Sequence, residues 1–244
     1  MSFEKGFTKD NLDVYLKELA KEYKRSGGRN APAEIILIGG AAALANYGFR
    51  ESTYDIDALI SASSAMKDAI STVGDRMGLP NGWINTDFER TVSYSPRLIE
   101  CSQYYRTFSN IVTIRAITSE YLIAMKLRSA RQYKNDISDI VGIIAEQKKI
   151  GKPISFLDVD KAVIKLYGSW DKISILAQED LNAAFESNDL SALYQTIRKR
   201  ELTTRDQLIE IEKKYPKRLT ENNLDDVIQS LFAAQKNSKS SKTK

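Results

Sequence analysis

Hydrophobic and polar positions follow two different patterns along this chain, and the change falls near residue 150. Before that point, short apolar runs bounded by glycine or polar residues predict strands. The strands are expected at Glu34–Ile38, Ile56–Ile60, Arg97–Tyr105 and Asn110–Ile117. Apolar residues at helical spacing predict helices at 8–25, 41–47, 63–77, 119–133 and 136–147. Because the strands follow one another with few helices between them, an α+β layer is favoured over a doubly wound sheet.

The second pattern is helical throughout. Helical spacing predicts helices around 158–167, 177–187, 190–213 and 221–234, with no strand-like alternation among them. Gly151-Lys152-Pro153 is the clearest linker. The predicted fold is therefore a small mixed sheet with flanking helices, followed by an all-helical C-terminal half. The predicted domains are residues 1–150, 151–235 and a basic tail at 236–244.

Composition narrows the chemistry more than it narrows the fold. The chain has no histidine and one cysteine, Cys101. These counts exclude Ser-His-Asp and Cys-His triads, histidine metal ligands, zinc fingers and an intramolecular disulfide. An enzyme with this composition works with carboxylates, lysine, arginine, tyrosine, hydroxyl groups and a hard metal ion such as Mg²⁺.

The net charge of +4 belongs to the tail, because Lys236–Lys244 holds four lysines and no acid. We expect this tail to be solvated and disordered. The segment Ile197–Arg218 has eight basic residues and four acids, which fits a charged amphipathic helix or a nucleic-acid-binding face. The chain shows neither a signal-peptide core nor an apolar stretch long enough to span a membrane, so we expect a cytoplasmic protein without membrane contact.

The stretch from Ile35 to Ile60 carries the most informative motif. A predicted strand ends in Gly39-Gly40, a short helix follows at once, and the next predicted strand carries Asp55 and Asp57. Glycines without a Cβ let the backbone approach an anion, and the N–H groups at a helix N-terminus favour phosphate. Two carboxylates on one strand face repel each other unless a cation such as Mg²⁺ lies between them. The plainer readings are a tight turn and two solvated aspartates.

These residues resemble the signature of the nucleotidyltransferase superfamily, which has the polymerase-β-like fold. A hydrophobic strand, Gly-Gly and an acid-hydrophobic-acid strand make up that signature. The Arg50-Glu51-Ser52-Thr53 stretch matches a toxin-like branch found in toxin–antitoxin and phage-defence systems. A later block of the same branch is matched by Lys126-Leu127, Arg131, Asp136 and Asp139.

The resemblance implies nucleotidyl transfer from a nucleoside triphosphate to a hydroxyl group of RNA, such as tRNA, or of protein. Asp55 and Asp57 would hold Mg²⁺, and Lys126 would reach a phosphate. The remaining nucleotide-binding residues that it implies are Gly39, Gly40, Arg50, Ser52, Arg131, Asp136 and Asp139. The plainer reading takes Lys126 and Arg131 as surface cations, and the two later aspartates as partners of a helix dipole. Neither the nucleotide nor the oligomeric state follows from the sequence.

One part of the superfamily pattern lacks a clear match. Catalytic members usually carry a third carboxylate on a neighbouring strand, and Glu100 is the best candidate, ahead of Asp87 and Glu89. The sequence therefore leaves open a non-catalytic member that binds a nucleotide, an RNA or a cognate partner protein. A third hypothesis is an RNA-binding protein that uses the Ile197–Arg218 face and the lysine tail.

Overall fold

The apolar run around Ile35 forms the central strand of a mixed sheet. β1 (Ala33–Leu37) pairs antiparallel with β2 (Ile56–Ser61) and parallel with β5 (Val112–Ile117). β3 (Ile84–Asn85) extends the sheet beside β2, and β4 (Ser102–Phe108) extends it beside β5. The resulting strand order is β3-β2-β1-β5-β4. This mixed sheet, together with its flanking helices, confirms the predicted α+β class.

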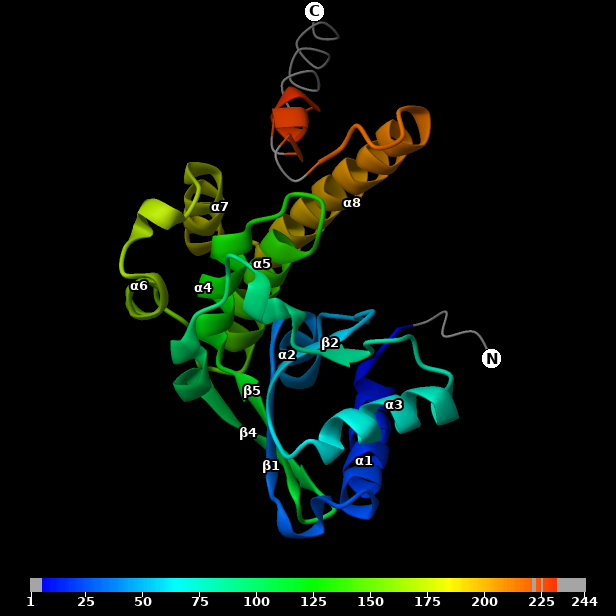
Figure 1. Ribbon diagram of the computed structural model, residues 1–244. Coiled ribbons are helices and arrows are strands. Elements are labelled where there is room, and N and C mark those ends of the chain that lie inside the picture. The colour runs from blue at the N-terminus through cyan, green and yellow to red at the C-terminus, as the bar shows by residue number, and fades with distance from the viewer. Residues whose placement is uncertain (1–5, 221–222, 225, 232–244) are drawn as a thin grey trace, which may run out of the picture.

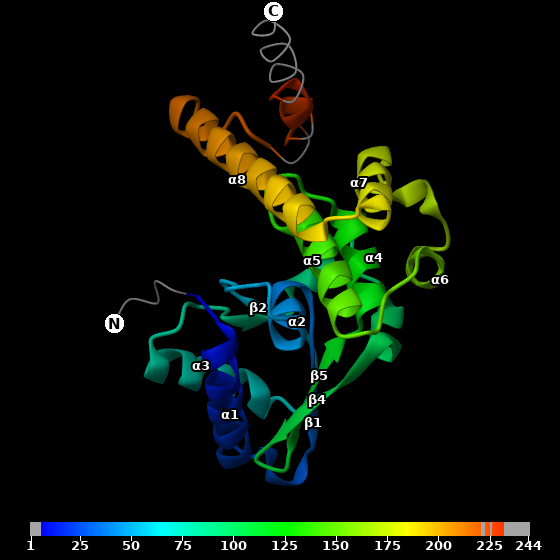
Figure 2. The same cartoon turned by 180° about the vertical axis from the view of Figure 1, so that it is seen from behind.

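The computed structural model describes residues 6–220, 223–224 and 226–231 (Figure 1). The α-helices before residue 150 in this part of the chain are α1 (Lys9–Arg25), α2 (Gly39–Asn46), α3 (Ala65–Met77), α4 (Ser119–Ser129) and α5 (Asp136–Lys149). Figures 1 and 2 both show α1 and α3 side by side, while α4 and α5 lie beyond the end of β5. Because α2 contacts both β2 and α4, it lies where the sheet meets the second group of helices.

Beyond residue 150, the described residues form helices and turns without a strand. The α-helices there are α6 (Phe156–Tyr167), α7 (Ile175–Glu186) and α8 (Leu190–Lys214). α6 packs on α4, and both α7 and α8 pack on α5, which confirms the helical C-terminal half. The predicted helix at 221–234 lies only partly within the described residues, and the predicted tail at 236–244 lies outside them. The division into domains at residue 150 stays a prediction.

The strand expected at Arg97–Tyr105 is wrong over its first five residues. A 3₁₀ helix spans Pro96–Cys101, and β4 begins only at Ser102. Pro96 explains the difference, because its fixed φ and its missing N–H group suit the first position of a helix. Leu98 and Cys101, three residues apart, are the buried residues of this turn. The buried residues of the segment expected to be a strand are therefore spaced by one helical turn.

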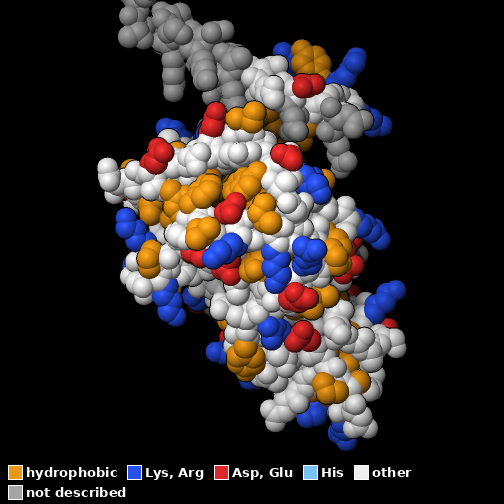
Figure 3. Space-filling model, turned by 90° about the vertical axis from the view of Figure 1, so that its left-hand side faces the viewer, with side chains coloured by type: hydrophobic (Ala, Val, Ile, Leu, Met, Phe, Trp, Pro, Cys, Tyr) orange, Lys and Arg blue, Asp and Glu red, His pale blue; other side chains and the backbone are white. Residues whose placement is uncertain are grey.

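The helical half leaves apolar side chains exposed on the face shown in Figure 3. Hydrophobic side chains gather on the upper part of this face, on the side where α6 and α7 lie in Figure 1. The exposed large apolar side chains of these two helices are Phe156, Leu157, Ile164, Ile175 and Leu176. None of the helices in the described ranges is both long enough and apolar enough to cross a membrane.

Candidate functional site

The turn from β1 into α2 brings the predicted glycine pair against the predicted aspartates. Gly39 has a left-handed φ of 54°, and a Cβ on this residue would lie 3.3 Å from Oδ2 of Asp57. A Cβ on Gly40 would lie 2.5 Å from Oγ1 of Thr53 and 2.8 Å from Nη2 of Arg50. Both positions therefore require glycine, the first mainly for its backbone conformation and the second for space. The N-terminus of α2 consequently opens beside Asp57 and Arg50.

Asp55 and Asp57 differ in their surroundings. Asp55 is exposed in a bend before β2, whereas Asp57 is half-buried within β2. The sequence placed both aspartates on this strand, but β2 carries only Asp57. Burial and the charge of Asp55 raise the pKa of Asp57 to about 6, although Arg131, Lys126 and Lys134 oppose the shift. The two carboxylates thus repel each other, and a cation between them would relieve the repulsion.

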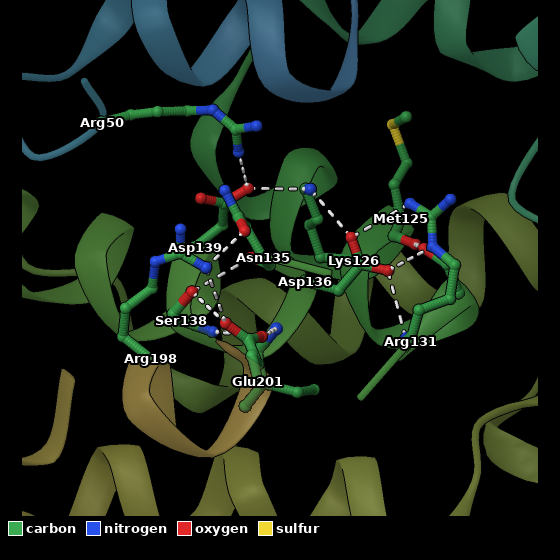
Figure 4. A network of polar contacts seen from close by, with 12 residues as sticks. Arg50, Met125, Lys126, Arg131, Asn135, Asp136, Ser138, Asp139, Arg198 and Glu201 are labelled. Atoms are coloured by element: carbon green, nitrogen blue, oxygen red, sulfur yellow. Dashed lines mark hydrogen bonds and ion pairs between the residues drawn. The ribbon is translucent and has the colours of Figure 1, made fainter. Parts of the chain in front are cut away.

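The predicted cation Lys126 is buried in a network of charges on α4 and α5 (Figure 4). Its ammonium group lies 2.9 Å from Oδ1 of Asp136 and 2.8 Å from Oδ2 of Asp139. Burial lowers the pKa of Lys126, but the two carboxylates together raise it by more than burial lowers it, so the pKa lies above its ordinary value. The ammonium group is therefore charged and already paired on two sides, and a direct contact with phosphate would require one of these pairs to open.

Two arginines complete this network. Arg50 forms an ion pair with Asp139, and its Nε donates a hydrogen bond to the carbonyl oxygen of Ser52 at 3.1 Å. Arg131 contacts both carboxylate oxygens of Asp136, with Nε at 2.8 Å from Oδ2 and Nη2 at 3.2 Å from Oδ1. Burial opposes ionisation of Asp136, yet Lys126 and Arg131 hold its pKa below the ordinary range. Together, these contacts link the loop before β2 to α4 and α5.

Glu100, the predicted third carboxylate, does not lie beside the aspartate pair. It belongs to the 3₁₀ helix before β4, with its side chain 72% exposed and 3.4 Å from Nζ of Lys165. β1 and β5 separate β4 from β2 in the sheet. Asp87 and Glu89 are exposed in a 3₁₀ helix at Asp87–Arg90. Within the described residues, no three acidic or cysteine side chains lie together in a way that could hold a metal ion.

On the side of β2 away from β1, the neighbouring strand is the two-residue β3, which the sequence did not predict. Asn85 is the register partner of Asp57 there. The side chain of Asn85 is used locally: Oδ1 accepts a hydrogen bond from the N–H of Asp87 at 2.9 Å, and Nδ2 donates to the carbonyl oxygen of Gly82 at 3.1 Å. β3 therefore places the amide of Asn85, rather than a carboxylate, at the register position beside Asp57.

Glu201 on α8 is a buried residue of the site that the sequence did not single out. Its Oε1 accepts hydrogen bonds from the N–H groups of Ile137 and Ser138 at 2.9 and 3.1 Å, and its Oε2 accepts one from Oγ of Ser138. Glu201 thus caps the N-terminus of α5, the turn of helix that carries Asp136 and Asp139 (Figure 4). Burial raises the pKa of Glu201 to about 7.

A second missed residue is Lys134, which lies in the turn between α4 and α5. Its charge lowers the pKa of Asp57, so it belongs to the electrostatic surroundings of the aspartate pair. No sequence signal separates it from other polar residues of that turn. The site as a whole combines a helix N-terminus, two carboxylates and several cations, an arrangement suited to a phosphate group and a hard metal ion.

Most of the chain matches a known protein family. A family model described as a nucleotidyltransferase of unknown function (DUF6036) matches residues 14–202. This range is more than half of the chain and includes the glycine turn, the aspartate pair, the charge network and Glu201. No curated protein and no solved structure matches the chain.

Proposed function

Since the chain belongs to this nucleotidyltransferase family, we propose that it transfers a nucleotidyl group from a nucleoside triphosphate to a hydroxyl group of RNA or protein. The observation that carries the proposal is the close approach of Gly39 and Gly40 to Asp57 and Arg50. A triphosphate held at the N-terminus of α2 would lie beside the carboxylate of Asp57 and near Arg50, which belongs to the charge network.

The residues present fit Mg²⁺ as a cofactor. Asp55 and Asp57 would supply oxygen ligands, and the charge of Asp55 adds to burial in raising the pKa of Asp57. Mg²⁺ is usually bound by one or two carboxylates together with substrate phosphates, so two carboxylates suffice. When bound, the ion would neutralise charge on the phosphates during the displacement.

The other residues of the site would orient the substrates. The free N–H groups of α2 would bind phosphate oxygens, and Arg50 would hold the loop before β2 against this helix. Lys126, Asp136 and Asp139 would keep Arg50 in place through their ion pairs. In the reaction, the acceptor hydroxyl group would release its proton to solvent as its oxygen bonds to the α-phosphorus and the bond to pyrophosphate breaks.

The proposal is tested by incubating the protein with each of the four nucleoside triphosphates, labelled on the α-phosphate, with Mg²⁺ and with cellular RNA or protein. The test variant is Asp55→Ala/Asp57→Ala, which removes both metal-binding carboxylates. Asp68→Ala/Asp75→Ala is the matched control, because both residues are exposed on α3. We expect label on an acceptor with the wild type and the control and none with the test variant. Equal labelling by wild type and test variant, or none with any nucleotide, would contradict the proposal.

A second candidate function is a non-catalytic protein of the same family that binds a nucleotide or a partner. The observation favouring it is that no third carboxylate joins the pair in the described part of the chain. If Asp55→Ala leaves the protein's effect in the cell intact, this second candidate is favoured over the enzyme.

We also propose that the protein has a role in a toxin–antitoxin pair or in phage defence, and that it is located in the cytoplasm.

A further inference from the structure

A cavity of about 370 Å³ lies at the opposite end of α4 from the charge network. Its walls come from the first turn of α4, the end of α5, the linker after α5 and the first half of α6, which packs on α4 (Figures 1 and 2). Ser119 begins α4 at the cavity, and Lys126 lies seven residues further along the helix, which corresponds to roughly 10 Å. The cavity is therefore separate from the proposed nucleotide site, and its volume is in the range of small-molecule sites.

The first turn of α4 brings backbone donors to this cavity. Ser119, Glu120 and Tyr121 form the turn and line the cavity. The first backbone hydrogen bond within the helix runs from the N–H of Leu122 to the carbonyl oxygen of Thr118 at 2.9 Å, and the side chain of Thr118 does not cap this end. The earlier N–H groups of the helix therefore have no intrahelical partner, and their partial positive charge favours an anion.

The buried hydroxyl group of Ser119 adds a donor at the same place. Ser119 is 8% exposed, and its Oγ lies 2.5 Å from the hydroxyl oxygen of the buried Tyr47. The same Oγ accepts a hydrogen bond from Nε2 of Gln147 at 2.7 Å. Whichever hydroxyl group donates in the bond between Tyr47 and Ser119, the other keeps a proton that has no acceptor among the described residues. Because buried donors are nearly always satisfied and only Ser119 of the two lines the cavity, its hydroxyl group is the one placed to donate to a ligand.

Two lysines bring positive charge to the cavity. Lys152 of the linker and Lys161 of α6 belong to its lining, and both are exposed. Neither forms an ion pair with another residue in the part of the chain that the structure describes. Two ammonium groups without an internal partner can bind an incoming anion without breaking an ion pair.

The two carboxylates of the lining are engaged in local hydrogen bonds instead of contacts with these lysines. Glu120 accepts a hydrogen bond from the hydroxyl group of Thr118 at 2.8 Å. Asp158 accepts hydrogen bonds from the N–H and hydroxyl groups of Ser155 at 2.9 and 2.6 Å, as part of the capping box of α6. The cations of the cavity are therefore left for a ligand.

We propose that this cavity binds a small sugar phosphate, with its phosphate group held between Lys152, Lys161 and the start of α4. The two ammonium groups, the Ser119 hydroxyl group and the free N–H groups match the charge and the three acceptor oxygens of a phosphate monoester. A single carboxylate has only two oxygens and one charge, which would leave donors unused. The cavity is larger than a phosphate group, and the remaining oxygens of Glu120 and Asp158 would accept hydrogen bonds from sugar hydroxyl groups. This site is independent of the proposed nucleotidyl transfer.

The test measures binding of ribose 5-phosphate and of ribose to the full chain by isothermal titration calorimetry, without a divalent metal ion. The variants are Lys152→Ala and Lys161→Ala, with Lys148→Ala as the matched control, because Lys148 is an exposed lysine of α5 outside the cavity lining. We expect ribose 5-phosphate to bind the wild type and ribose to bind far more weakly. Each of the two cavity variants should weaken the binding of ribose 5-phosphate about tenfold or more, because a charge-assisted contact is lost. Lys148→Ala should bind as the wild type does.

Ser119→Ala tests the hydroxyl donor and should weaken binding about fivefold. If ribose 5-phosphate binds no better than ribose, or if both cavity lysine variants bind it within about twofold of the wild type, the cavity is not a phosphate site and the proposal fails. A changed affinity in Asp55→Ala/Asp57→Ala, in place of a change in the lysine variants, would locate the phosphate at the aspartate pair. That result would overturn this inference and leave the proposed function standing.

Discussion

At the scale of single residues, burial decides what Lys126 can do. A buried ammonium group is stable only when it is paired, and the two aspartates on α5 supply that pairing. The sequence pattern identifies Lys126, Asp136 and Asp139 as a group, and the structure brings them together. Spacing alone could not show that they contact one another rather than a substrate, because that depends on how the turn after α4 folds back. Lys134, in that turn, shows no sequence pattern at all.

Gly40 offers the sharpest test of the site at this scale. A Cβ there would lie too close to Thr53 and Arg50, so Gly40→Ala should displace these two side chains and disturb the contacts of Arg50 with Ser52 and Asp139. We expect a loss of about 1–3 kcal/mol in the free energy of unfolding, together with weaker nucleotide binding. Urea denaturation and calorimetry measure the two effects.

Gly48→Ala serves as the control for this substitution. A Cβ on Gly48 would have only an ordinary contact, 3.8 Å from Oε2 of Glu146, and Gly48 does not have a positive φ. It should change the free energy of unfolding little or raise it slightly. If both substitutions have the same effect, the close approach of the loop to α2 is not what requires glycine at position 40.

At the scale of elements, the cap on α5 connects the two halves of the chain. Glu201 comes from α8, yet it satisfies backbone N–H groups at the start of α5. Asp136 and Asp139 lie in this first turn and hold Lys126, Arg50 and Arg131 in place. The geometry of the charge network therefore depends on a helix that follows it by more than fifty residues.

The raised pKa of Glu201 predicts a pH dependence of stability. The folded protein retains a proton on Glu201 up to about pH 7, whereas the unfolded chain releases it near the ordinary value of 4.5. The contribution of Glu201 to stability is therefore present below pH 4.5 and is lost as the pH rises through 7. Glu201→Gln removes this titration while it keeps a similar shape and an acceptor oxygen.

The measurement is urea denaturation of the wild type and of Glu201→Gln across this range. We expect the stability of the wild type, relative to the variant, to fall by on the order of 3 kcal/mol between about pH 4 and about pH 8. Asp57 has a raised pKa in both proteins, so its effect cancels. A difference that is constant, or that grows with pH, would show that Glu201 is not protonated in the folded state.

The elements themselves were largely predictable from apolar spacing. β1, β2, α1, α3 and α5 begin and end within a few residues of their predicted limits. The failures have local causes: Pro96 starts a 3₁₀ helix in place of a strand, and β3 is too short for any alternation to show. The cap from Glu201 was not predictable, because on α8 this residue is one acid among many charges and only tertiary packing buries it.

At the scale of the whole molecule, the predicted boundary near residue 150 is crossed by several polar contacts. The hydroxyl group of Tyr167 donates to the carbonyl oxygen of Ser93 at 2.8 Å, and Nη1 of Arg128 donates to that of Lys172 at 2.8 Å. The cap from Glu201 crosses the same boundary. α4 and α5 also pack against α6, α7 and α8, so the helical half completes the environment of the charge network.

These contacts predict that residues 1–150 do not fold independently. Truncation after residue 150 exposes the apolar faces of α4 and α5 and leaves the start of α5 without its cap. Circular dichroism of this fragment should show no cooperative thermal transition, in contrast to the full chain. A cooperative melt close to that of the full chain would show that the first half is stable alone.

The position of the transferred phosphate tests the central proposal most directly. The full chain is incubated with Mg²⁺, cellular RNA or protein, and the same nucleoside triphosphate labelled either on the α-phosphate or on the γ-phosphate. Nucleotidyl transfer predicts that the acceptor gains only the α-label, and that Asp55→Ala/Asp57→Ala abolishes the transfer. An acceptor labelled from the γ-phosphate, or α-labelling that survives in the double variant, would contradict the account.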